Sequence, residues 1–179
     1  KRGGMNPADV YRAMRTYIFG YLPADLTADD EQRAEVIERW EKRKTWDITE
    51  ADLLEILPFV QERVGLLGEV PDMVAFLFTP DDALVIDEDA RKTLGDSSAD
   101  VLDSALTALD GLSSWDTASL EASLRDALVE GLGVSPRHAF GPLRVALSGR
   151  RVSPPLFESM EVLGRDSSMA RLRALRQSL

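Results

Sequence analysis

The 179-residue sequence contains no cysteine and a single histidine, His138. Without cysteine it cannot form disulfides, a thiolate nucleophile, or a site in which cysteine binds zinc or an iron–sulfur cluster. One histidine excludes any site that needs two histidines from one copy of the chain. No apolar run approaches the ~20 residues that would span a bilayer, and no signal peptide is visible. These absences predict a cytoplasmic protein without a metal site or a membrane partner.

Positive charge is scarce overall but concentrated near the C-terminus. The chain carries 21 Lys and Arg against 31 Asp and Glu, a net charge of −10. Residues 134–179 hold eight arginines and three acids, which gives this segment +5 and leaves −15 for the rest. The planar guanidinium group of arginine can donate paired hydrogen bonds to phosphates and to base edges. We therefore expect the C-terminal arginines to gather on one basic face, although a solvated helix surface would show the same charges.

Helical signals run through the whole chain. Cap-then-proline pairs at Ser135–Pro136 and Ser153–Pro154, and a cap at Thr117, predict helix starts, while Gly149 and Gly164 predict helix ends. No alternation is long enough to build a sheet. The sequence predicts an all-α fold of two small helical bundle subdomains, residues 1–90 and 91–179, with the boundary in the stretch 87–99.

No constellation of residues supports catalysis. His138 has no acid or nucleophile beside it in the sequence, so we expect a surface or hydrogen-bonded histidine. The acids of residues 81–89 lack the spacing and the glycine of an EF-hand, and acids at helix N-termini account for them better. The chain therefore resembles a binding module, with no catalytic, cofactor or metal site of its own.

Residues 139–164 carry a specific pattern. Pro142, Arg144, Ala146, Ser148 and Gly149 match P-x-R-x-A-x-[ST]-G, and the segment 153–158 matches [ST]-P-x-L-F-E. This resembles the C-terminal region of bacterial, actinobacterial-like glutamyl-tRNA synthetases. The resemblance runs from about residue 47 to the C-terminus, and residues 1–46 do not match clearly.

That resemblance implies an anticodon-binding region made of two helical bundles. Its partners would be the anticodon loop of tRNA(Glu) and an N-terminal catalytic domain of the same polypeptide, which ligates glutamate to the tRNA with ATP and magnesium. The signatures of that domain, H-I-G-H and K-M-S-K-S, are absent here, so we expect a non-catalytic, monomeric part of a glutamate–tRNA ligase. A first residue other than methionine fits a fragment or a processed product.

The resemblance also assigns RNA-binding residues. Arg144 matches the base-contacting arginine of the family, and Ser153, Pro154 and Leu156 match its [ST]-P-x-L element. Arg63 matches an arginine that in many members favours the glutamate anticodon over the glutamine one. Three of these have a structural alternative: Leu156 as core, Pro154 as a first-turn proline, and Arg63 paired with a surface acid. Arg144 is harder to explain in that way, because an arginine in an apolar stretch requires a partner.

A different class of function stays open from the residues alone. The acidic N-terminal two thirds could bind a protein partner, with the tRNA motif kept only as scaffold. Phosphate contacts would make RNA binding fall steeply with salt, whereas an acidic protein-binding module would show no RNA binding.

Overall fold

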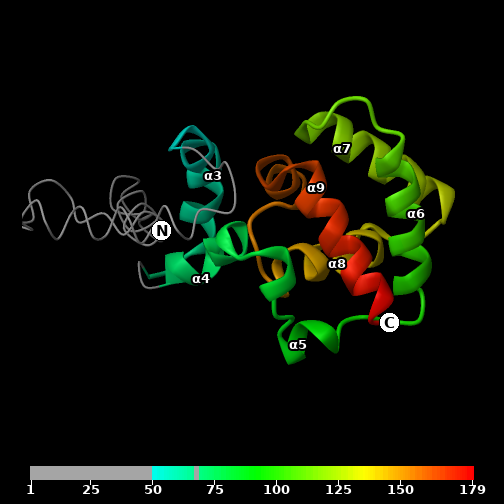
Figure 1. Ribbon diagram of the computed structural model, residues 1–179, viewed down its shortest axis with the longest axis horizontal. Coiled ribbons are helices and arrows are strands. Elements are labelled where there is room, and N and C mark those ends of the chain that lie inside the picture. Colours follow the sequence, from blue (N-terminus) through cyan, green and yellow to red (C-terminus); the bar gives the residue numbers. More distant parts are fainter. Residues whose placement is uncertain (1–49, 67–68) are drawn as a thin grey trace, which may run out of the picture. The chain divides into compact units, whose positions relative to one another are not determined.

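The computed structural model describes residues 50–66 and 69–179. It divides into two compact units, Lys1–Phe78 and Thr79–Leu179, which are described separately. The helix starts that the sequence predicts at Asn6, Thr27 and Thr49 lie outside the described residues. Figure 1 labels the helices used below.

The described part of the first unit is helical. It consists of α3 (Glu50–Arg63), α4 (Val70–Val74) and the 3-10 helix η2 (Ala75–Phe78). Ile56, Val60 and Val64 recur every four residues and are buried, as expected for one face of a helix. In the sequence, Pro58 interrupts the apolar pattern and predicts either a new helix start or a kink. The structure shows α3 continuing through Pro58 as one element.

The second unit contains the remaining elements. In chain order they are η3 (Asp81–Ala83), α5 (Glu88–Arg91), α6 (Ser98–Asp110), α7 (Thr117–Leu124), the π-helical segment η4 (Arg125–Gly131), α8 (Pro136–Ser148) and α9 (Leu156–Gln177). No strand occurs among the described residues, so the predicted all-α class is confirmed. No helix in this part of the chain is both long and apolar enough to cross a membrane.

One hydrophobic core holds the second unit together. Helix α9 packs against α6, α7 and α8, and α8 and α9 lie at the centre of the bundle (Figure 1). On α6 the buried residues Val101, Leu102, Ala105 and Leu109 follow helical spacing and are completely inaccessible to solvent. Leu143 and Leu172 bring α8 and α9 into the same cluster.

The boundary between the units falls earlier than the sequence suggested. The prediction assigned residues up to Ala90 to the first subdomain, whereas the second unit begins at Thr79. Ala90 is completely buried in the core of the second unit. The Asp87 backbone N–H donates to the Gly149 carbonyl at 2.8 Å. Long-range contacts of this kind have no signature in local composition, so the composition of the stretch 87–99 does not reveal them.

The N-cap of α7 is Asp116 and not the predicted Thr117. The Asp116 carboxylate accepts hydrogen bonds from the Ser119 backbone N–H and hydroxyl, both at 2.9 Å. Thr117 is the first helical residue, and its N–H and hydroxyl donate to Glu161 on α9. The Ser119 backbone N–H, followed by its hydroxyl, holds the pKa of Asp116 below its ordinary value.

We predict that Asp116→Ala lowers the thermal midpoint at neutral pH, because the cap hydrogen bonds are lost. A lowered folded-state pKa means that this stabilisation is present above the ordinary aspartate pKa and is lost as the pH falls through the folded value. The difference from the unmodified chain should therefore shrink below about pH 4. Asp116→Asn is the control, since asparagine also caps but does not titrate. A difference for Asp116→Ala that persists unchanged in acid would contradict this account.

Two predicted helix ends are confirmed, and one start is shifted. Gly149 follows α8 with φ 71°, and Gly164 breaks the helical geometry within α9 with φ 78°. Both are positive φ values that glycine adopts readily. Helix α9 begins at Leu156, so Ser153 and Pro154 belong to the turn that precedes it and not to its first helical turn.

Candidate nucleic-acid interface

One face of α8 carries charged and small residues instead of core residues. Arg137 and Arg144 are seven residues apart, close to two full turns, so they project from the same side of the helix about 10 Å apart along its axis. Gly141 lies between them on that side. The opposite side supplies Ala139, buried in the core.

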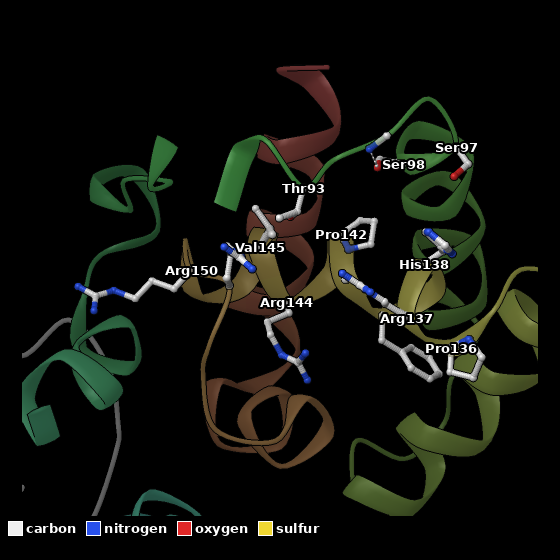
Figure 2. A pocket seen from close by; sticks show the side chains of 14 residues that line it. Thr93, Ser97, Ser98, Pro136, Arg137, His138, Pro142, Arg144, Val145 and Arg150 are labelled. Atoms are coloured by element: carbon white, nitrogen blue, oxygen red, sulfur yellow. Dashed lines mark hydrogen bonds between the residues drawn. The ribbon is translucent and has the colours of Figure 1, made fainter. Parts of the chain in front are cut away.

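This face of α8 forms the wall of an open groove of about 630 Å³. The lining comes from the end of α5, the start of α6, α8 and the segment after α8, and includes Thr93, Gly95, Ser97, Ser98, Pro136, Arg137, His138, Phe140, Pro142, Arg144, Val145, Arg150 and Arg151. Figure 2 shows Arg137 and Arg144 leaving α8 along this wall, whereas Arg150, from the segment after α8, extends away from them. Four arginines line the groove, and none of the described residues that line it is acidic.

The groove arginines differ in their surroundings. Arg150 and Arg151 lie at one end, where Asp87 and Asp89 approach them at 3.9 and 3.8 Å. These exposed pairs are long and weak. Arg137, at the α8 N-terminal end, is exposed and forms no ion pair with any described residue. Positive charge is therefore least compensated beside Arg137.

His138 is exposed in the groove, as the sequence led us to expect. Its Nδ1 lies 2.8 Å from the Ser135 hydroxyl. No described acid forms an ion pair with it. Its position supports a hydrogen-bonding role at the groove wall.

The structure places the four predicted site residues of the second unit in three different settings. Arg144 is half-buried in the groove wall. Ser153 and Pro154 are buried in the turn before α9, and the Ser153 hydroxyl donates to the Pro154 carbonyl at 3.0 Å. Leu156 is 5% exposed and belongs to the hydrophobic core, which was the structural alternative weighed for it.

Arg63 belongs to the first unit, whereas the other four predicted site residues belong to the second. It closes the C-terminal end of α3, where its guanidinium donates to the Phe59 carbonyl at 3.1 Å. Its neighbour Glu62 lies 3.9 Å away. Both contacts are within the last turns of its own helix.

The expectation of a single basic face is wrong for the arginines of α9. Arg165 donates to the carbonyls of Leu109 and Leu112 and lies 4.9 Å from the centre of the Trp115 ring. Arg176 makes two hydrogen bonds with Asp103 on α6. These side chains fasten α9 to the bundle and do not line the groove.

Arg171 has the most buried guanidinium of this group, with 2% of its side chain exposed. It donates to Asp81 Oδ1 at 2.6 Å, to the Leu147 carbonyl at 2.8 Å and to the Thr79 carbonyl at 2.7 Å. The predicted role of Asp81, an acid favoured by a helix N-terminus, is therefore incomplete, because this carboxylate also anchors α9. Arginines that contribute equally to the net charge of the sequence therefore have different roles in the structure.

A family model described as an anticodon binding domain matches residues 31–176, most of the chain. The chain belongs to the anticodon-binding domain family. This membership confirms the resemblance given by residues 139–164.

Curated relatives of this anticodon-binding domain are glutamate–tRNA ligases of actinobacteria. The ligase of Kineococcus radiotolerans is 61% identical over 122 residues, which are 68% of this chain and 24% of that protein. The ligase of Bifidobacterium adolescentis is 52% identical over 141 residues, which are 75% of this chain and 28% of that protein. The chain thus spans about a quarter of the length of these relatives.

A solved structure shares the fold of this anticodon-binding domain. The crystal structure of a glutamate tRNA ligase from Elizabethkingia meningosepticum, in complex with its amino acid, aligns with a TM-score of 0.68 and 18% identity. The alignment covers 98% of this chain and 30% of that one. At 18% identity, this similarity shows that the two chains share a fold.

Sequence reasoning missed part of the groove in this anticodon-binding domain. Arg137, Arg150 and Arg151 entered only as members of the expected basic face, and the start of α6, which the sequence places at Ser97 and Ser98, was not assigned to a binding site. One usable signal was the spacing of Arg137 and Arg144, which places two arginines on one helix face. The contribution of Ser97 and Ser98 depends on how α6 packs beside α8, which no local pattern encodes.

Proposed function

We propose that this chain is the anticodon-recognition part of a glutamate–tRNA ligase and that its groove binds the anticodon loop of tRNA(Glu). The whole ligase would join glutamate to the tRNA in the cytoplasm as a monomer, with ATP and magnesium bound by a catalytic domain outside this chain. The family membership and the similarity to curated ligases support this proposal. The observation that carries it is a groove lined by four arginines, and by no acid among its described lining residues, in a chain of net charge −10.

Arg144 is the residue best placed to read a base. It is half-buried in the groove wall, so its guanidinium is less free to swing than that of an exposed arginine. Single-stranded loop bases are recognised when they are splayed out and hydrogen-bonded along their edges. An arginine fork can donate two such bonds to one base.

Ser153, Pro154 and Leu156 would act through the shape of the turn before α9. Their side chains are buried, so a contribution to RNA binding would come from backbone groups that the prolines hold in place. Arg63 would contribute from the first unit, by exchanging its contact with the Phe59 carbonyl for one with RNA.

We predict that Arg144→Ala in the intact ligase weakens recognition of the cognate anticodon by roughly 1–3 kcal/mol, because a base-edge contact is lost. Binding or charging should be measured at fixed salt with tRNA(Glu) and with variants that change one anticodon base. The loss should be smaller for at least one changed base, since that base no longer offered the contact.

Arg173→Ala is the matched control, because Arg173 is exposed on α9 and does not line the groove. A melting curve should accompany both variants, since truncation of a half-buried arginine can also loosen a helical bundle. Equal losses for cognate and changed anticodons would contradict base reading by Arg144. An intact protein that shows no salt-dependent binding to tRNA would favour the alternative, an acidic module that binds a protein.

A further inference from the structure

We propose that the α8 N-terminal end of the groove, around Arg137, is a phosphate-binding subsite that holds the RNA backbone while Arg144 contacts a base. This inference rests on the proposed function and deepens it by dividing the groove into a reading part and a backbone-holding part. It concerns Arg137 and its neighbour His138, which the matched sequence motif does not include.

Position on the helix is the first argument. Arg137 and Arg144 share one face of α8 and line the same groove about 10 Å apart along the axis. A strand of RNA that lies along this wall with a base at Arg144 would pass Arg137 within a small number of nucleotides. The two arginines can therefore act on one strand at the same time.

Burial is the second argument, and it separates the two roles. Arg144 is half-buried, whereas Arg137 is exposed. An exposed, freely rotating arginine suits a phosphate, which presents charge in many directions, better than a base edge, which needs a fixed fork. His138 beside it can donate or accept a further hydrogen bond through its ring.

Charge is the third argument. Asp87 and Asp89 approach Arg150 and Arg151 at the other end of the groove. No described residue forms an ion pair with Arg137. A phosphate that reaches Arg137 therefore displaces no carboxylate of the described residues. This end of the groove should attract a backbone phosphate without losing an existing ion pair.

The test measures binding of tRNA(Glu) to the intact protein over a series of salt concentrations. Loss of one phosphate contact reduces the slope of log K against log salt by about 0.7–1. For Arg137→Ala this corresponds to about five- to tenfold weaker binding at 0.1 M salt, fading towards 1 M. The loss should be the same for the cognate tRNA and for variants with one changed anticodon base. Arg137→Lys, which keeps the charge, should keep the slope.

Arg173→Ala is again the matched control and should leave the slope unchanged. An unchanged slope in Arg137→Ala would overturn the subsite, and so would a loss that depends on the anticodon base. If Arg144→Ala alters base preference in the same series, the proposed function survives that failure. An intact protein without salt-dependent RNA binding would instead remove the proposed function, and the subsite with it.

Discussion

Replacement of Arg171 by methionine is expected to lower the free energy of unfolding of residues 79–179 by about 3–5 kcal/mol. The guanidinium is buried and donates to Asp81 and to the carbonyls of Leu147 and Thr79. Methionine fills much of the space but leaves all three acceptors without this donor. A buried acceptor that loses its partner keeps the full penalty of its desolvation.

Chemical denaturation followed by circular dichroism would measure this loss. Arg173→Met is the matched control, because it makes the same replacement two positions along α9 at an exposed site; it should change stability by less than about 0.5 kcal/mol. A double variant with Asp81→Leu should recover part of the loss, since no carboxylate then remains without its partner. Similar stabilities for Arg171→Met and Arg173→Met would show that this network contributes little.

Gly149→Ala is expected to cause the second large loss. The φ of 71° at Gly149 already disfavours any side chain. A Cβ added there would overlap the backbone carbonyl of Val85, which cannot move aside as a flexible side chain could. The thermal midpoint should fall by roughly 10 °C, because the left-handed strain and the clash together cost more than about 2 kcal/mol.

Gly111→Ala is the control for that variant. Gly111 follows α6 with φ −83°, and a Cβ there would meet nothing within 4 Å. Differential scanning calorimetry should show a midpoint close to that of the unmodified chain. A Gly149→Ala variant as stable as Gly111→Ala would mean that residues 85–87 can shift away from α8 without loss.

The secondary structure was largely predictable, because it depends on residues close in sequence. The spacing of Val101, Ala105 and Leu109 predicted helix α6, and Gly149 predicted the end of α8. The cap of α7 was not predictable with the same certainty, since Asp116 and Thr117 are both good caps. Only the packing of α7 beside Glu161 decides between them.

The candidate site was predictable only in its centre. The motif pointed to Arg144, which does line the groove. Sequence reasoning could not separate the arginines that line the groove from those that stabilise the fold, because Arg165 and Arg171 have partners more than 50 residues away in sequence. The place where the second unit begins has no local signal for the same reason, because the bonds of Arg171 to Thr79 and Asp81 join residues 90 or more positions apart.

The arginine-lined groove of this acidic chain, whose described lining residues include no acid, has a kinetic consequence. At 0.01 M ionic strength the Debye length is about 30 Å, so an approaching polyanion feels the net charge of −10. At 0.1 M it is about 10 Å, and the polyanion feels mainly the surface it faces. At this ionic strength an RNA that approaches an acidic part of the surface is repelled, whereas an RNA that approaches the groove is attracted by its arginines. Dilution of the buffer should therefore speed association less than it does for a uniformly basic RNA-binding protein.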